Sequence, residues 1–264
     1  MTIWQEFENQ CVEHFNKRFS RYAHFILQGG TNSTIPDILV KSMSGKSFYI
    51  EAKHSPAQCG QFVLLPHLDT CTFEYSKLNV NRINRYAETI IDYMNRNFDV
   101  FHTAGTTGKK IDIPNASNIF ADWIIHTYRD KGTNFFVTNN FTLLPLESFK
   151  DYFDVTAKYR IKRSGSSSVG KSKIELILNH IISKEYLITS HRINGNKLFV
   201  SSPNNLDEQR FIIRGMEYMF SLRGNEYELR KLSNTYNANV IFSIKQKEDI
   251  PPGMTDDEFI EYLR

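Results

Sequence analysis

PDILVKSMSGKSFYIEAK, residues 36–53, is the stretch that decides the fold around it. Asp37 precedes the apolar run 38–40, and a second apolar run begins at residue 47. The residues between these runs, 42–46, are small, polar or glycine, which is the composition of a tight turn. The pattern therefore predicts a β-hairpin, with side chains alternating between the two faces of each strand.

The hairpin gathers three charged side chains at one end of the sheet. Glu51 and Lys53 stand two residues apart at the end of the second strand, so they point to the same face while Ala52 points away. The first strand of an antiparallel hairpin starts beside the end of the second, which places Asp37 next to them. Two carboxylates and one ammonium group are expected to converge.

Such a cluster suits phosphodiester hydrolysis. The carboxylates of Asp37 and Glu51, with the main-chain carbonyl of Ala52, form a plausible Mg²⁺ site of hard oxygen ligands. Lys53 can orient or deprotonate the attacking water and offset charge on the phosphate. Each residue taken alone could have a structural role without catalysis, since an Asp before a strand often ends a turn and an E-x-K pair often faces solvent. Their coupling through one hairpin favours an active site.

The spacing of these residues resembles a known family. A PD dipeptide, thirteen intervening residues and then E-x-K are similar to the PD-(D/E)xK nuclease superfamily, and within it the chain looks like a type II restriction endonuclease. The resemblance implies an α/β restriction-endonuclease-like core, a mixed sheet flanked by helices. It also implies Mg²⁺-dependent, sequence-specific hydrolysis of double-stranded DNA that leaves 5′-phosphates. A cognate DNA methyltransferase is expected in the same system, but not as a stable partner of this chain. A homodimer on a palindromic site is the simplest way to cut both strands.

The resemblance also suggests further residues for the active site. Many members of the superfamily place an acid from the first helix near the metal, and Glu6 and Glu13 are the two candidates for that position. A polar residue shortly after the E-x-K triplet braces the site in several families, for which Gln61 is preferred to Gln58. His54 lies close enough to act as a base, but Lys53 already fills that role.

The composition limits what else the chain could be. It has 264 residues, of which 41% are apolar and 23% charged, as expected for a folded protein with one good core or two small ones. No apolar run approaches the roughly 20 residues that a membrane span needs, and the N-terminus lacks the features of a secretion signal, so a cytoplasmic protein without membrane contact is expected. The three cysteines show no CxxC spacing, which favours reduced thiols over disulfides or zinc.

The first part of the chain has the element order of a nuclease core. Apolar residues recur every three to four positions from residue 3, which predicts an amphipathic helix, and a short strand follows near residues 22–28. Beyond the hairpin we expect a helix over 77–97, a loop over 101–118, a helix over 119–128 and a strand over 134–138. Residues 1–155 are accordingly predicted to form the core.

Residues 156–264 are predicted to form a basic, strand-rich region that recognises DNA, and because no clean linker precedes it, this region and the core can pack as one unit. Between residues 158 and 247 there are sixteen Lys or Arg against seven Asp or Glu, and two hairpins are indicated over 186–202 and 217–232. A positive surface beside a phosphodiester-cleaving cluster favours a nucleic acid substrate. A loop over 159–172 supplies the candidate DNA contacts, which are Arg160, Lys162, Arg163, Ser164 and Lys171.

Two alternatives remain open. Residues 165–172, GSSSVGKS, satisfy the P-loop spacing, but no later apolar run ends in the Asp that would hold Mg²⁺ there, so nucleotide binding is the weaker hypothesis. A structure-specific or repair nuclease would share Asp37, Glu51 and Lys53 without reading a base sequence. Discrete bands from plasmid DNA, as opposed to cleavage of branched DNA, would separate a restriction enzyme from a repair nuclease.

Overall fold

A computed structural model describes residues 3–28, 35–163, 165–184, 186–232 and 236–264. The chain divides into two compact units, Met1–Arg160 with Ala238–Arg264, and Ile161–Asn237. The boundary predicted at 155/156 is close to the first crossing between the two units, after Arg160. Residues 238–264 return to unit 1, where they add a strand and a helix to its core.

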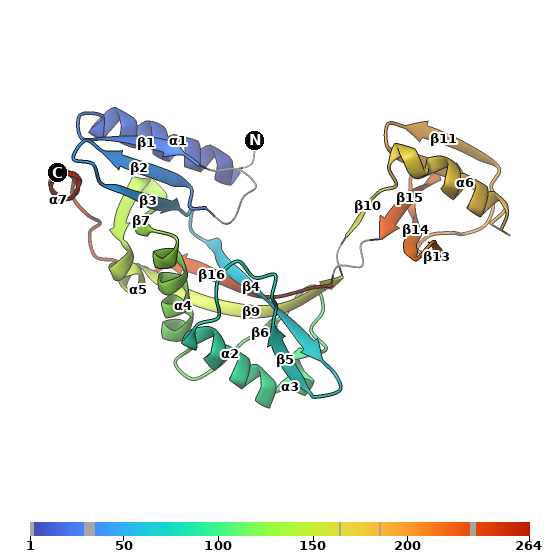
Figure 1. Cartoon of the computed structure of the whole chain (residues 1–264), viewed down its shortest axis with the longest axis horizontal. Helices are drawn as coiled ribbons and strands as arrows, with labels where there is room; N and C mark the ends of the chain where they lie inside the picture. Colours follow the sequence, from blue (N-terminus) through green and yellow to red (C-terminus); the bar gives the residue numbers. More distant parts are fainter. Residues whose placement is uncertain (1–2, 29–34, 164, 185, 233–235) are drawn as a thin grey trace. The chain divides into compact units, whose positions relative to one another are not determined.

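The first sheet of unit 1 is mixed and has the strand order β1-β2-β3-β7-β8. The predicted hairpin is confirmed, because β2 (Ile38–Ser42) and β3 (Ser47–Ala52) pair antiparallel with Ile38 opposite Ile50. β1 (Ala23–Leu27) pairs antiparallel with β2, while β7 (Thr133–Thr138) pairs parallel with β3 and antiparallel with β8 (Thr142–Pro145). The mixed α/β class expected from the sequence is confirmed (Figure 1).

Alternation along the strands divides the core between the two faces of this sheet. Val40, Ile50 and Val137 pack with helices α1 (Ile3–Phe19) and α7 (Asp256–Leu263) in one apolar cluster. Phe136, which points the other way, contacts the ring of Tyr128 from α4 (Ala116–Asp130). Glu51 lies opposite Phe136 in the parallel pair, so Glu51 also faces α4. Glu51 is thereby placed between the sheet and helix α4.

The second sheet of unit 1 has the order β5-β4-β16-β9-β6. Its strands are β4 (Ala57–His67), β5 (Thr72–Tyr75), β6 (Lys109–Lys110), β9 (Phe153–Arg163) and β16 (Tyr236–Gln246). β16 pairs antiparallel with β4 across an irregularity between Ile241 and Ser243. Trp123 of α4 stacks on Phe242 of β16 with ring centroids 4.3 Å apart. Helix α4 therefore contacts both sheets and fixes them around one cleft.

Shorter elements complete unit 1 and correct two sequence-based boundaries. Residues 77–97 contain a shorter helix than predicted, α2 (Arg85–Arg96), which begins where the Asn84 side chain accepts hydrogen bonds from the backbone N–H groups of Tyr86 and Ala87. Residues 101–118 were expected to be loop but include β6 and the start of α4. The other helices are α3 (Phe98–Phe101), α5 (Phe149–Tyr152) and the 3₁₀ turns η1 (Asn139–Phe141) and η2 (Leu146–Ser148).

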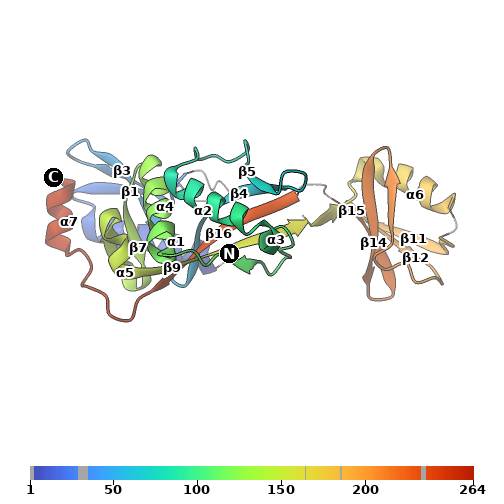
Figure 2. The same ribbon diagram turned by 90° about the horizontal axis from the view of Figure 1, so that it is seen from below.

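Unit 2 is a small sheet packed against one helix, α6 (Ile174–Ile182), which is seen beside its strands in Figure 2. The strand order is β11-β12-β15-β14-β13, and β10 pairs with β15. Both predicted hairpins are present. The strands are β10 (Ser166–Ser168), β11 (Ser190–Asn194), β12 (Lys197–Ser201), β13 (Arg210–Ile213), β14 (Met216–Arg223) and β15 (Glu226–Leu232), and η3 (Lys171–Lys173) leads into α6.

The loop predicted over residues 159–172 is wrong for most of its length. β9 continues to Arg163, and Ser166–Ser168 form strand β10, with Ser167 paired to Lys231. A P-loop wraps successive backbone amides around a phosphate, whereas Ser166–Ser168 form part of an antiparallel ladder. This geometry opposes the nucleotide-binding hypothesis. Among the described residues, no helix is long and apolar enough to cross a membrane.

Candidate active site

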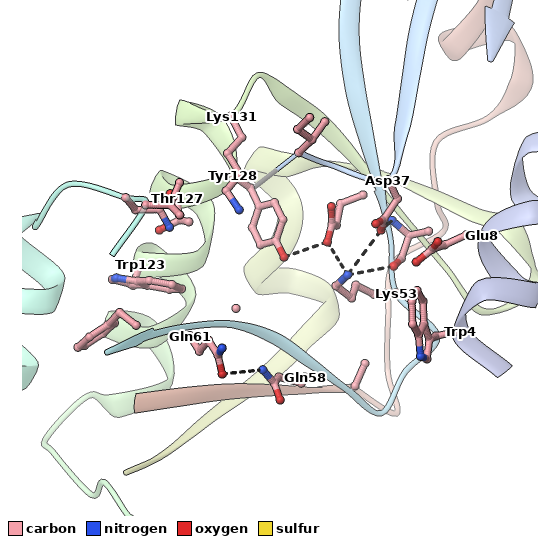
Figure 3. A pocket seen from close by; sticks show the side chains of 18 of the residues that line it. Trp4, Glu8, Asp37, Lys53, Gln58, Gln61, Trp123, Thr127, Tyr128 and Lys131 are labelled. Atoms are coloured by element: carbon pink, nitrogen blue, oxygen red, sulfur yellow. Dashed lines mark hydrogen bonds and ion pairs between the residues drawn. The ribbon is translucent and has the colours of Figure 1, made fainter. Parts of the chain in front are cut away.

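The hairpin brings Asp37, Glu51 and Lys53 together as predicted, at the end of β3. Asp37 and Lys53 are labelled in Figure 3. Asp37 immediately precedes β2, and its Oδ2 accepts a hydrogen bond of 3.0 Å from the backbone N–H of Ala52. Lys53 follows β3 and is held by its own backbone N–H, which donates to the carbonyl of Val137 at 2.8 Å. The three side chains are thus fixed by main-chain pairing and not by flexible loops.

The Lys53 ammonium lies among three oxygen atoms. It pairs with Glu51 Oε1, donates to the Ala52 carbonyl at 3.2 Å, and lies 3.6 Å from Asp37 Oδ2. The Lys53 side chain is 17% exposed and that of Glu51 only 6%. The charges of the cluster are therefore largely shielded from solvent.

Burial and mutual charge set the protonation of this cluster. Burial, followed by the neighbouring Glu51 carboxylate, raises the pKa of Asp37 to about 7, although Lys53 and the Ala52 N–H oppose the rise. Burial alone would lower the pKa of Lys53, but the carboxylates of Glu51 and Asp37 outweigh it, and the net pKa is raised. Lys53 consequently stays positively charged between the two acids.

Tyr128 of α4 is a member of the site that the sequence did not reveal. Its hydroxyl donates a hydrogen bond of 2.9 Å to Glu51 Oε1, and both residues are buried. Burial, and then the Glu51 charge, raises the pKa of Tyr128 well above its usual range, so the hydroxyl remains a donor. The contact depends on the parallel pairing of β3 with β7, which aligns residues far apart in the sequence.

On the first helix, the acid that lines the cleft is Glu8, and not Glu6 or Glu13, the two candidates left open by the sequence. Glu6 and Glu13 are exposed, whereas Glu8 is 7% exposed and lines the cleft beside Asp37 and Lys53. Burial raises the pKa of Glu8, with Lys53 opposing the rise. The helical periodicity of the sequence already places Glu8 on the buried face of α1, because Cys11 and Phe15 follow it by three and seven residues.

The cleft that opens on this cluster has a volume of about 990 Å³. Gln61 and Gln58 both line it from β4, and Gln58 Nε2 donates to Gln61 Oε1 at 3.3 Å. His54 also lines the cleft, with its ring packed edge-on against Phe7. Gln61 therefore shares the cleft with Asp37, Glu51 and Lys53.

The donor set fits a hard divalent cation. Asp37 Oδ2, Glu51 Oε1 and the Ala52 carbonyl already converge on one positive group, the Lys53 ammonium. Carboxylate and carbonyl oxygens are the ligands that Mg²⁺ prefers, and Mg²⁺ commonly uses one or two carboxylates together with water and substrate phosphate. Within the described residues, no group of three or more His, Cys, Asp or Glu is placed to hold a metal. The candidate set is two carboxylates and one carbonyl.

Comparison with known proteins gives one informative match. No family model matches the sequence, and no curated protein matches it. The fold is similar to a solved structure of HhaI endonuclease in complex with DNA, with a TM-score of 0.73 and 35% sequence identity over 99% of each chain. The chain belongs to the HhaI endonuclease family. The similarity to HhaI endonuclease runs through both units, so the resemblance to a restriction endonuclease extends beyond the hairpin motif.

In this member of the HhaI endonuclease family, the five predicted DNA contacts do not lie on one loop. Arg160 is half-buried in β9, and its Nε has no hydrogen-bond partner among the described residues. Lys162 and Arg163 belong to the end of β9, and Lys171 is exposed in η3. Ser164 lies outside the described residues. Whether these residues bind DNA stays a prediction.

Proposed function

We propose that this chain is a Mg²⁺-dependent type II restriction endonuclease that hydrolyses double-stranded DNA at a specific sequence and leaves 5′-phosphates. The observation that carries the proposal is the convergence of Asp37, Glu51 and Lys53 in a cleft, on a chain of the HhaI endonuclease family. Because HhaI endonuclease was solved with DNA, duplex DNA is the expected partner here too.

The residues of the cleft have distinct roles in the proposed reaction. Asp37, Glu51 and the Ala52 carbonyl would hold Mg²⁺, which when bound acts as a Lewis acid on the phosphate and lowers the pKa of water. Lys53 has three N–H donors, with which it orients the attacking water and offsets charge on the scissile phosphate. Tyr128 keeps the Glu51 carboxylate in place through its hydrogen bond. Gln61 lies in the same cleft, where its amide can brace the site or contact the scissile strand.

DNA contacts outside the cleft are proposed for the cationic residues on β9 and after it. Arg160, Lys162 and Arg163 end this strand, and Lys158 on the same strand pairs with Lys110 of β6. Ser164 and Lys171 follow in the chain. Cations grouped in this way suit phosphate contacts, which position a duplex without reading its sequence.

Cutting a duplex takes two hydrolysis events, and Asp37, Glu51 and Lys53 form a single cluster in each chain. Two copies on a palindromic site would make both cuts in one binding event, and this homodimer remains the sequence-based proposal. A methyltransferase of the same specificity would protect the host DNA. A structure-specific nuclease is the second candidate, but the relationship to HhaI endonuclease favours a restriction enzyme.

The test is digestion of plasmid and phage DNA by the purified protein with Mg²⁺ or with EDTA. Wild type is expected to give discrete bands with Mg²⁺ alone, and Asp37→Ala is expected to give none. Asp257→Ala, which removes an exposed carboxylate on α7, serves as the matched control and should cut like wild type. DNA left intact by wild type in every buffer, or branched DNA cut in preference to linear duplex, would rule out the restriction enzyme.

A further inference from the structure

Helix α4 brings a second lysine to the cleft. Trp123, Thr127 and Lys131 recur every four residues, so they share one face of the helix, and all three line the cleft. Figure 3 shows the Lys131 side chain running alongside Tyr128, on the same side of the cleft as the Glu51 hydrogen bond. Lys131 closes the end of α4 as its C-cap residue, which fixes where its side chain starts.

Acidic side chains in the lining of the cleft would repel DNA unless a further cation offsets their charge. Glu8, Asp37 and Glu51 are three acids on its wall, and Lys53 lies between the last two. A DNA strand is a polyanion, so its approach to these acids is opposed unless further positive charge offsets the repulsion. Among the described residues that line the cleft, Lys53 and Lys131 carry the ammonium groups.

The ring of Tyr128 separates the two ammonium groups. At one end the Tyr128 hydroxyl bonds to Glu51, which pairs with Lys53, and the Lys131 ammonium lies 5.2 Å from the centre of the same ring. Lys131 is therefore displaced along the cleft from the cluster of Asp37, Glu51 and Lys53. A lysine at this position meets the DNA backbone away from the bond that breaks.

We propose that Lys131 binds the backbone phosphate next to the scissile one and holds the cut strand in the cleft. The inference rests on the proposed nuclease function and adds a substrate-binding residue to it. Lysine binds phosphate as a compact point charge, so the positive charge matters more than the shape of the group. Lys131 does not touch the reacting atoms, and its loss should weaken binding while the rate of the bound complex is largely retained.

A purely structural role makes a different prediction. Lys131 packs against the Tyr128 ring, so its replacement could disturb Glu51 through Tyr128. That disturbance would lower the rate of bond cleavage and leave the number of phosphate contacts unchanged. The salt dependence of DNA binding separates the two roles, because each phosphate contact contributes about 0.9 to the slope of log affinity against log salt concentration.

The experiment measures binding of a specific duplex in EDTA across a salt series, and single-turnover cleavage in Mg²⁺. Lys131→Gln is expected to weaken binding about tenfold or more and to reduce the magnitude of the salt slope by about 0.9. Lys131→Arg should restore both. Arg129→Gln is the matched control, since Arg129 is an exposed cation on the same helix that pairs with Glu147 and is not among the residues that line the cleft.

The outcomes separate this inference from the proposed function. A wild-type slope for Lys131→Gln, in a protein whose wild type binds and cuts duplex DNA, overturns the role of Lys131 and leaves the nuclease in place. An equal loss of slope in Arg129→Gln also overturns it, because the contact would then not be specific to the cleft. A wild type that neither binds nor cuts duplex DNA overturns the proposed function, and the inference with it.

Discussion

Tyr128→Phe removes the hydrogen bond between helix α4 and Glu51, an acid of the candidate site. The substitution removes one hydroxyl and keeps the ring, which packs edge-on against Phe136 with centroids 5.1 Å apart. The lost contact is the 2.9 Å bond to Glu51 Oε1, made between two residues that are each 5% exposed. No large cavity is created, so the hydrogen bond accounts for most of the effect.

The size of the expected loss in free energy of unfolding follows from the charge of the acceptor, the Glu51 carboxylate. A hydrogen bond to a charged group stabilises a folded protein by about 1.5–3 kcal/mol, against about 1 kcal/mol for a neutral pair. Glu51 keeps its ion pair with Lys53 in the variant, which places the expected loss toward the lower half of that range. If the bond also orients Glu51 during catalysis, the same free energy corresponds to a loss of rate of roughly tenfold or more.

Urea unfolding, followed by tryptophan fluorescence, measures the loss in the free energy of unfolding of unit 1. The chain has two tryptophans, Trp4 and Trp123, and both belong to unit 1, so the signal reports on the unit that contains the site. A double-mutant cycle with Glu51→Gln gives the coupling free energy directly. A coupling indistinguishable from zero would refute the claim that Tyr128 holds Glu51.

The remaining predictions concern the thiols, one glycine and the assembly. At pH 8 a thiol reagent should modify the exposed Cys71 rapidly and leave Cys11 and Cys59 unmodified in the folded protein. The two unmodified thiols are buried, and burial raises the pKa of each to about 12. Rapid labelling of all three thiols would contradict this prediction. Since both thiols ionise at lower pH once unfolded, the free energy of unfolding should fall as the pH rises from about 9 toward 12, and Cys59→Ala should reduce that fall. Gly60→Ala should destabilise unit 1 by about 1–3 kcal/mol, because the new Cβ would lie 2.8 Å from the Trp123 ring and because the φ angle of residue 60 is +91°. An unchanged midpoint of urea unfolding would show that the Trp123 ring moves aside. Sedimentation with a specific duplex should give two chains per duplex for the proposed homodimer, whereas one chain per duplex, with nicked DNA accumulating before the second cut, would exclude it.

The hairpin could be predicted from the sequence because its information is local. Apolar runs, a turn of small polar residues and the spacing of Asp37, Glu51 and Lys53 lie within eighteen residues, and strand alternation fixes their faces. Glu8 could also have been found from the sequence, because it lies on the buried face of α1 that the apolar spacing predicts.

The rest of the site depends on contacts between distant parts of the chain. Tyr128 reaches Glu51, 77 positions earlier, because β7 pairs in parallel with β3 and α4 packs across the sheet. The pairing of β16 with β4 is another contact between distant parts of the chain, and it brings residues 238–264 back into unit 1. No element was predicted over residues 54–65, where β4 forms with the distant strand β16 as its partner.

The most direct test of the central claim is a comparison of DNA binding with single-turnover cleavage for Lys53→Met. This variant keeps most of the aliphatic side chain and removes the ammonium that lies among Asp37, Glu51 and the Ala52 carbonyl. If the cluster is the active site, cleavage should slow about 100-fold or more while specific binding of the duplex is retained. Cleavage at the wild-type rate by a folded Lys53→Met protein would show that the phosphodiester bond is broken elsewhere.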